Sequence, residues 1–323
     1  MTGKKLRWGI VATGGIAEVM VGDLGRVTDC EVAAVSSRTA ARAEEFAGRH
    51  GIPLAHGDYR LLVADPDVDV VYVATPHAQH HEVARAALLA GKHVLCEKPL
   101  TTTVAHTEEL VALARGRGLF LMEAMWTRFN PLIRLLRDLV AAGTIGTVHS
   151  VRADFGFAHP YEPTHRLWNP ALGGGSVLDL GIYPVAFAHM LLGEPTSVRA
   201  HGRLAPNGVD AEAAMLLGHD DGSHALLGSS LVSQPAIAAS VIGAKGRVEL
   251  PELFFRPSVM TVIADGESKE HRIELDGAGY TYQLRAAAEA IRAGALECPE
   301  MPHDDTIAIA RTLAAVRDQL GVA

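Results

Sequence analysis

The stretch that decides the fold is "GIVATGGIA", residues 9–17 of a chain of 323 residues. An apolar run leads into it and an amphipathic pattern follows, which predicts a strand, a glycine-rich turn and a helix. This is the context of the dinucleotide pyrophosphate loop, G-x-G-x-x-G/A. Gly14 supplies the glycine that lets the backbone approach the phosphates, and Ala17 supplies the small residue that lets the helix pack on the strand.

The first glycine of that pattern is replaced by Ala12. One methyl group is tolerable there if Ala12 has a negative φ, and Gly15 adds freedom to the neighbouring backbone. The N-terminus of the helix that follows would offer unpaired N–H groups and a positive dipole end to the phosphates. The alternative is a tight turn that binds no ligand.

The alternation of strand and helix continues through the first third of the chain. It predicts strands over residues 7–13, 31–37, 68–76, 93–99 and 119–126, and helices over 14–25, 39–51, 79–92 and 101–118. Such an order is typical of a Rossmann-type, doubly wound parallel sheet with helices on both faces. We therefore expect an α/β protein with a dinucleotide-binding domain over residues 1–124.

The pattern changes to period-two alternation after residue 126. A helix over residues 131–143 precedes strands predicted over 147–157, 196–204, 211–219, 223–232 and 236–250, and helices over 282–294 and 304–321 end the chain. This predicts a second α/β domain, residues 125–323, with a mostly antiparallel, open-faced sheet for substrate binding and oligomerisation. The terminal helices can pack back on the first domain.

The composition excludes several classes of protein. Hydrophobic residues make up 48% and charged residues 20%, and no uninterrupted apolar run reaches the roughly 18 residues of a membrane helix. The net charge is −8 without a basic run, which argues against nucleic acid. The N-terminus is a poor signal peptide and the three cysteines are scattered, so we expect a cytoplasmic protein that binds a small molecule.

The end of the second predicted strand indicates which nicotinamide cofactor would bind. An NAD site needs an acidic residue there for the ribose 2′-hydroxyl, whereas NADP needs a cation for the 2′-phosphate. The sequence offers no acid but Ser37 and Arg38. These residues favour NADP(H) over NAD(H), because Arg38 can make a charge-assisted contact with the phosphate. The alternative is an exposed arginine at the start of a helix.

Two further motifs carry side chains suited to proton transfer. "CEKPL" places Glu97 and Lys98 at the carboxyl end of a predicted sheet strand, and "GGGSVLDLGIYPV" places Asp179 and Tyr183 four residues apart. If this segment is helical, these two side chains share one face. A tyrosine whose phenolate is stabilised by a lysine can exchange a hydroxyl proton near neutral pH. Each residue alone would more simply be a solvated lysine or a core tyrosine.

The glycine loop, "ATPHAQHHEVARAALLAGKHVLCEKPL" and "GGGSVLDLGIYP", in this order, resemble the family of glucose–fructose oxidoreductase, inositol dehydrogenase and rhizopine catabolism proteins. Within it, "MEAMWTRFNP" and the glycine-run motif are most similar to the branch of dimeric trans-dihydrodiol dehydrogenases and NADP-dependent D-xylose dehydrogenases. The resemblance covers essentially the whole chain. It implies a Rossmann domain and a C-terminal α/β domain whose open sheet often forms the oligomer interface.

The resemblance also implies roles for individual residues. Lys98 would touch the nicotinamide ribose and the reacting hydroxyl, Tyr183 would be the general acid/base, and Asp179 would help to bind substrate or set the local pKa. In the family pattern T-P-N-x-x-H, His80 matches the histidine, whereas His77 departs from the asparagine, so its contact is undetermined. The predicted cofactor-binding set is Thr13, Gly14, Gly15, Ile16, Ser37, Arg38, Thr75, His77, His80, Glu97, Lys98, Arg166 and Trp168.

Two interpretations are open for each of four further residues. Trp126 and Arg128 would line the substrate pocket or pack between domains, and Arg166 and Trp168 would close over the nicotinamide or anchor a loop. The histidines at positions 77, 80 and 81 lack a partner at ligand spacing, so no metal is expected.

These observations predict an NADP(H)-dependent oxidoreductase that transfers hydride to or from a secondary alcohol or hemiacetal carbon of a sugar or cyclic diol. A keto- or anhydro-sugar reductase working in the opposite direction needs the same residues, and a catalytically silent NADP-binding regulator is the alternative of another class. We expect a homodimer or homotetramer.

Overall fold

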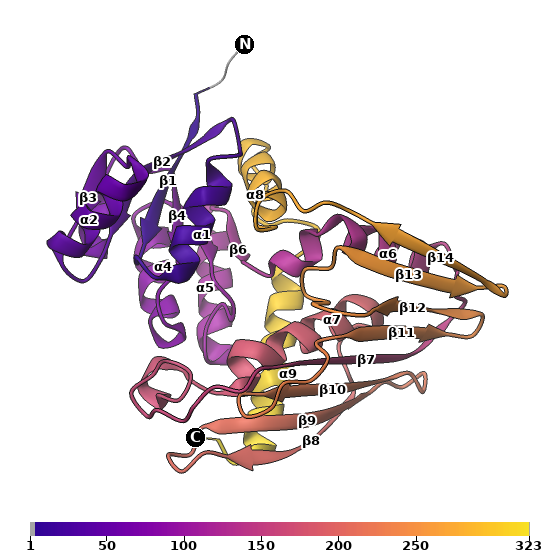
Figure 1. The fold of residues 1–323 in the computed structure, drawn as a ribbon. Coiled ribbons are helices and arrows are strands. Elements are labelled where there is room, and N and C mark those ends of the chain that lie inside the picture. The colour runs from indigo at the N-terminus through magenta and orange to yellow at the C-terminus, as the bar shows by residue number, and fades with distance from the viewer. Residues whose placement is uncertain (1–3, 323) are drawn as a thin grey trace. The chain divides into compact units, whose positions relative to one another are not determined.

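The computed structural model describes residues 4–322. The chain divides into two compact units (Figure 1). The first contains the residues up to Trp126 together with Leu275–Thr306, and the second contains Thr127–Glu274 together with the residues from Ile307 onward. Each unit has its own sheet, and the two are described separately.

The sheet of the first unit is parallel and six-stranded, in the order β3-β2-β1-β4-β5-β6. Its strands are β1 (Leu6–Val11), β2 (Cys30–Ser36), β3 (Leu54–His56), β4 (Val70–Val73), β5 (His93–Cys96) and β6 (Leu121–Glu123). The strand order reverses between β1 and β4, so their carboxyl ends form the crevice in which open α/β sheets bind ligands. The side chains of β4 are all buried, as expected for a parallel strand covered on both faces.

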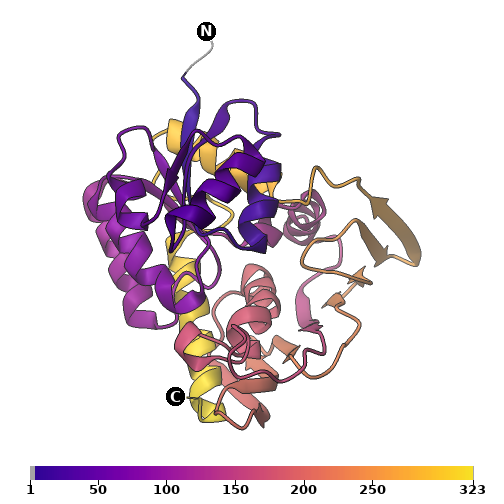
Figure 2. The same cartoon turned by 60° about the vertical axis from the view of Figure 1, so that its left-hand side comes forward.

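Helices lie on both sides of this sheet (Figure 2). They are α1 (Gly15–Leu24), α2 (Ala40–His50), α3 (Tyr59–Ala64), η1 (His77–Gln79), α4 (His80–Leu89), α5 (Val104–Arg117) and α8 (Thr281–Arg292). Thr103 caps α5 by accepting a hydrogen bond from the His106 amide, and threonine is one of the residues favoured at this position. Helix α8 is capped instead by a distant residue, because the buried carboxylate of Asp23 in α1 accepts the amide hydrogens of Tyr280 and Thr281.

The second unit contains an eight-stranded sheet in the order β14-β13-β12-β11-β7-β10-β9-β8. Only β7 and β10 pair in parallel, and every other pair is antiparallel. The strands are β7 (Val148–Gly156), β8 (Ser197–Leu204), β9 (Asp210–Gly218), β10 (His224–Ser230), β11 (Ala239–Gly243), β12 (Gly246–Leu250), β13 (Val259–Ala264) and β14 (Glu267–Arg272). The predicted α/β fold class, with one parallel and one mostly antiparallel sheet, is confirmed.

The helical elements of the second unit are α6 (Pro131–Ala141), η3 (Pro170–Leu172), the π-helix η4 (Val177–Gly181) and α7 (Ile182–Leu192). The short helix η2 (Trp126–Phe129) and the final helix α9 (His303–Leu320) contain residues of both units. Helix α7 packs on β7 and β10, and η4 packs on β7, β9 and β10, so together they cover one face of the sheet.

The structure differs from the prediction in places. The sequence pattern did not indicate β3, α3, β13 or β14. Over residues 4–322, one helical stretch, Pro170–Leu192, is long and apolar enough to cross a membrane by length and composition alone. Of its most apolar part, 83% is buried, as in the core helix of a globular domain.

Candidate active site

The glycine loop joins the carboxyl end of β1 to α1. Gly14, whose backbone is extended, is the N-cap of α1, and as a glycine it has no side chain to accept the amide hydrogens of the first turn, which begins with Gly15 and Ile16. Apart from the adjacent residues and the backbone of α1 itself, no atom of residues 4–322 lies within 4 Å of the position that a Cβ would take at Gly14 or Gly15. The space beside Gly14 and Gly15 is therefore open, at a helix end whose unpaired N–H groups suit a dinucleotide pyrophosphate.

The expectation for Ala12 is wrong in one respect. Its φ is +97°, a region that L side chains rarely adopt, rather than the negative angle that would make the methyl group harmless. Its amide still donates to the Ser36 carbonyl at 3.0 Å. The loop therefore keeps the backbone path that a glycine would take, with a strained alanine in it.

The residues predicted to select the cofactor lie where β2 ends. The hydroxyl of Thr13, from the glycine loop, lies 3.2 Å from the hydroxyl of Ser37. Arg38 is exposed, and no acidic side chain among residues 4–322 pairs with it. A free guanidinium next to a serine hydroxyl, at the edge of the sheet that carries the glycine loop, suits a 2′-phosphate.

The loop after β5 carries Glu97 and Lys98. Glu97 is buried and accepts a hydrogen bond of 2.5 Å from the hydroxyl of Tyr72 on β4. Burial and the neighbouring Glu97 carboxylate raise the pKa of Tyr72 well above its usual value, so this hydroxyl keeps its proton. The Leu100 amide donates to Glu123 at 2.8 Å. The chain is thus anchored on both sides of Lys98, at Glu97 and at Leu100, at the carboxyl edge of the sheet.

A pair of histidines lies beside this loop. His80 has no exposed surface, and its Nδ1 and Nε2 lie 2.7 Å and 2.8 Å from the carbonyl oxygens of Pro99 and Thr75. Burial, and after it the neighbouring His77, lowers the pKa of His80 to about 4. The ring is therefore neutral, and its single N–H donates to only one of the two carbonyls at a time. Both ring nitrogens of His80 are occupied by backbone carbonyls, those of Thr75 and Pro99. The ring of His77, also buried, is 5.6 Å from that of His80.

The second unit carries the other predicted catalytic residues. Asp179 lies in the π-helix η4, and Tyr183 lies in the first turn of α7 with 7% of its surface exposed. The segment is therefore helical, as their proposed common face requires. Arg166, predicted near the nicotinamide, donates from Nη1 to Asp179 Oδ1 at 3.1 Å. The exposed guanidinium and the buried carboxylate form an ion pair that sequence reasoning did not predict.

Two aromatic rings beside Tyr183 were also missed. Phe155, near the end of β7, and Phe255 stack at 4.5 Å, and their centroids lie 5.3 Å and 5.4 Å from the Tyr183 ring. Both phenylalanines are partly exposed. They are 100 residues apart in the chain, and no local pattern connects them. Their stack gives Tyr183 an apolar wall against which the nonpolar face of a ring can pack.

The remaining predicted residues are buried. The Trp168 indole donates to the Pro160 carbonyl at 2.9 Å, and its own carbonyl accepts from Asn207 at 2.5 Å, which are the contacts of a loop anchor. Trp126 stacks on Tyr280 at 4.0 Å. Arg128 donates to the Ala186 carbonyl.

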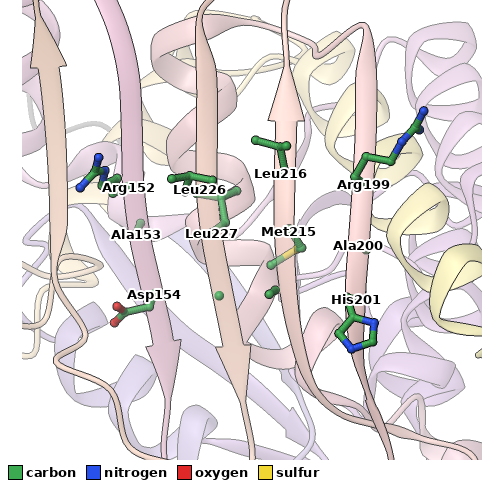
Figure 3. Close-up of a pocket in the computed structure, with 12 residues that line it drawn as sticks. Arg152, Ala153, Asp154, Arg199, Ala200, His201, Met215, Leu216, Leu226 and Leu227 are labelled. Carbon is green, nitrogen blue, oxygen red and sulfur yellow. The ribbon is translucent and has the colours of Figure 1, made fainter.

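The second sheet has a shallow hollow on its exposed face (Figure 3). None of the predicted site residues lines it. The lining residues come from β7, β8, β9 and β10 and are Arg152, Ala153, Asp154, Arg199, Ala200, His201, Ala214, Met215, Leu216, Leu226, Leu227 and Gly228. In the part of the chain that the structure describes, no group of three histidine, cysteine or acidic side chains is placed to hold a metal ion.

Comparison with known proteins now adds to this geometry. Residues 6–125 match the profile of the oxidoreductase family with an NAD-binding Rossmann fold, and residues 133–249 match the GFO/IDH/MocA C-terminal domain. The chain belongs to this oxidoreductase family. Its first unit is an NAD(P)-binding Rossmann domain, and the protein is an NAD(P)-dependent dehydrogenase or reductase.

Individual relatives agree over nearly the whole length. The chain is 39% identical to trans-1,2-dihydrobenzene-1,2-diol dehydrogenase of Mus musculus and of Homo sapiens, in each case over 98% of this chain and 97% of the relative. Among solved structures, it resembles aldose-aldose oxidoreductase from Caulobacter crescentus, complexed with glycerol (TM-score 0.89, 28% identity, 98% and 97% coverage). It also resembles a 3-ketoreductase from Actinomadura kijaniata in complex with NADP and TDP-benzene (TM-score 0.87, 29% identity, 98% coverage of both chains).

Proposed function

We propose that this protein is an NADP(H)-dependent oxidoreductase that transfers hydride to or from a secondary alcohol or hemiacetal carbon of a sugar or cyclic diol. The proposal rests mainly on the position of Lys98, which lies in an anchored loop at the same edge of the sheet as the open glycine loop. The names of the relatives, a diol dehydrogenase, an aldose oxidoreductase and a ketoreductase, support the substrate class.

The side chains have distinct proposed roles. The bound nicotinamide supplies the site that accepts or gives the hydride. Lys98 hydrogen-bonds the reacting hydroxyl and orients it, and Tyr183 exchanges the proton at that oxygen. Asp179, paired with Arg166, holds the substrate beside Tyr183. The stacked rings of Phe155 and Phe255 contact the apolar face of the substrate ring.

The cofactor site is proposed around the glycine loop. Thr13, Gly14, Gly15 and Ile16 would receive the pyrophosphate, and Ser37 and Arg38 the 2′-phosphate. Thr75, His77, His80 and Glu97 would shape the edge beneath the nicotinamide. Arg166 would border it, Trp168 would anchor the loop that carries Arg166, and Trp126 and Arg128 would support the substrate pocket.

Turnover of the Tyr183→Phe and Lys98→Ala variants tests the catalytic roles. Loss of a positioned acid/base lowers kcat by roughly 10²- to 10⁴-fold. The Kd of Tyr183→Phe for NADPH, measured by tryptophan fluorescence quenching, should change much less, because Tyr183 is not proposed to bind the cofactor. Near-wild-type turnover of Tyr183→Phe would show that the proton-transfer assignment is wrong.

Substrate screening in both directions distinguishes oxidation of an alcohol from reduction of a keto- or anhydro-sugar. The absence of any NADP-linked turnover would favour the catalytically silent regulator.

The Arg38→Ala variant tests the choice of cofactor. A charge-assisted contact contributes about 1.5–3 kcal/mol, so the Kd for NADPH should rise roughly 10- to 150-fold while the Kd for NADH hardly changes. Arg60→Ala is the matched control, because Arg60 is an exposed arginine of the same unit that pairs with its neighbour Asp58. Equal binding of both cofactors by the wild-type protein would remove Arg38 from this role.

The exposed face of the second sheet supports a homo-oligomer. Leu216 and Leu226 are paired across β9 and β10 and are 43% and 44% exposed, with Arg199 and Arg152 beside them on β8 and β7 (Figure 3). Exposed leucines on a flat sheet favour contact with another surface, and we propose a second copy of this chain. Leu226→Glu should then convert the oligomer to monomers in analytical ultracentrifugation, and an unchanged mass would refute this interface.

A further inference from the structure

The segment that leads into η4 is fastened to one buried carboxylate. Asp210, the first residue of β9, has no exposed surface. Its Oδ2 accepts a hydrogen bond of 2.6 Å from the Val177 amide and one of 2.9 Å from the Ser176 hydroxyl. The Ser176 oxygen also lies 3.0 Å from the hydroxyl of Ser229 on β10, which is placed to donate to it. The start of η4 is thus tied to two strands of the sheet.

The carboxylate replaces a local helix cap. Ser176 is the N-cap of η4, but its side chain does not accept a hydrogen bond from the first turn. The carboxylate of Asp210, from 33 residues further along the chain, accepts the Val177 amide instead. A negative group at the positive end of a helix is favourable, and this one holds the first turn from outside the helix.

Burying the Asp210 carboxylate at this position costs free energy. Its Oδ1 has no hydrogen-bond partner within residues 4–322, and burial raises the pKa of the carboxyl group. A buried acceptor without a partner costs about 1–3 kcal/mol, which is offset here by the two hydrogen bonds that Oδ2 receives from Ser176 and Val177. Packing alone therefore does not account for an aspartate here.

The backbone is drawn close to this carboxylate. Gly175 has a φ of +126°, and a Cβ at this position would overlap Asp210 Oδ1. The contact at Gly175 and the hydrogen bond at Val177 together fix both the position and the direction in which η4 starts. Asp179 lies two residues after Val177, and its own amide donates back to the Gly175 carbonyl at 3.3 Å.

We propose that Asp210 is a positioning residue, which sets the start of η4 and thereby the directions of Asp179 and Tyr183. This inference rests on the proposed role of Tyr183 as the acid/base. A π-helical turn is an uncommon form of helix that occurs frequently at functional sites, and the first residues of this one are held by Asp210. Displacing a reacting group by about 1 Å is enough to lower turnover roughly 10²-fold.

The test compares Asp210→Asn with Asp221→Asn, each in the wild-type and the Tyr183→Phe backgrounds. Asp221 is the matched control, because its carboxylate accepts the same two kinds of donor, the amide and the hydroxyl of Ser223, at 2.9 Å and 2.6 Å. In the Asp210→Asn variant the side-chain NH2 group would have to lie against one of the two donors, Ser176 and Val177, or against Gly175. The contacts that hold the start of η4 should therefore weaken. Circular dichroism and thermal unfolding verify that each variant is folded.

We expect Asp210→Asn to lower kcat by roughly 10- to 100-fold, with KM and the Kd for NADPH within about threefold of wild type. Asp221→Asn should leave kcat within about twofold. Because Asp210 acts through Tyr183, Asp210→Asn should cause little further loss when Tyr183 is already phenylalanine. Ser176→Ala replaces Asp210→Asn in this test if Asp210→Asn does not fold. It removes one hydrogen bond to the Asp210 carboxylate and should lower kcat by a smaller factor.

Three outcomes would overturn the inference. The first is a lower Tm of Asp210→Asn with unchanged kcat, which would make the contact purely structural. The second is a loss of kcat that multiplies with the loss from Tyr183→Phe, which would place the action of Asp210 elsewhere. The third is wild-type turnover by Tyr183→Phe alone, which would refute the proposed function itself and is recognisable from that single variant.

Discussion

Replacing Ala12 by glycine should stabilise the protein. Ala12 has a φ of +97°, and an L residue held in the left-handed region costs roughly 1–2 kcal/mol. Glycine removes that strain but gives the unfolded chain more freedom, which offsets about 0.5–1 kcal/mol. The net gain is about 0.5–1 kcal/mol, or a Tm higher by roughly 1–3 °C. Thermal unfolding of the protein without cofactor measures it.

Ala17→Gly, five residues later in the same fingerprint, provides a control of opposite sign. Ala17 lies buried within α1, where glycine loses about 1 kcal/mol of helix propensity and about 0.8 kcal/mol for the buried methyl group. One substitution should raise the Tm and the other should lower it. If Ala12→Gly lowers the Tm as Ala17→Gly does, the strained alanine and the argument built on it are wrong.

Three further substitutions test other parts of the structure. Asp23→Ala should lower the free energy of unfolding by about 3 kcal/mol or more in urea titrations, because it leaves the amides of residues 278, 280 and 281 without an acceptor; a loss below about 1 kcal/mol would contradict the capping role. His80 titrates near pH 4 when folded but near 6.5 when unfolded, so the unfolded chain takes up the proton first, and stability should fall by up to about 3 kcal/mol as the pH drops through this window. His80→Gln should remove that part of the pH dependence, and an unchanged slope would show that His80 is not its source. Gly175→Ala should lower the Tm and the yield of folded protein, because its Cβ would overlap the Asp210 carboxylate; wild-type stability would mean that this close approach is absent.

The first sheet, apart from β3, and its glycine loop could be predicted because their signals are local. The strand, the glycine turn and the helix are adjacent in sequence, and the buried β-branched run of β4 is legible without any partner. Helix α7 gave no such signal, because it is apolar on all sides and therefore shows no amphipathic period. The hairpin of β13 and β14 was missed although Asp265 and Gly266, both at positive φ, are a typical two-residue turn.

The sequence by itself determined the fold class, the order of most of the elements and which residue types could carry hydride and proton chemistry. Only the tertiary structure decided which of them meet: Arg166 pairs with Asp179, Phe155 stacks on Phe255, and Asp210 caps the turn that begins at Val177. Local patterns depend on the backbone geometry of consecutive residues, so they can be recognised in a short window. Contacts between distant residues depend on the path of the chain across the sheet and on backbone angles such as that of Ala12, which packing imposes against local preference.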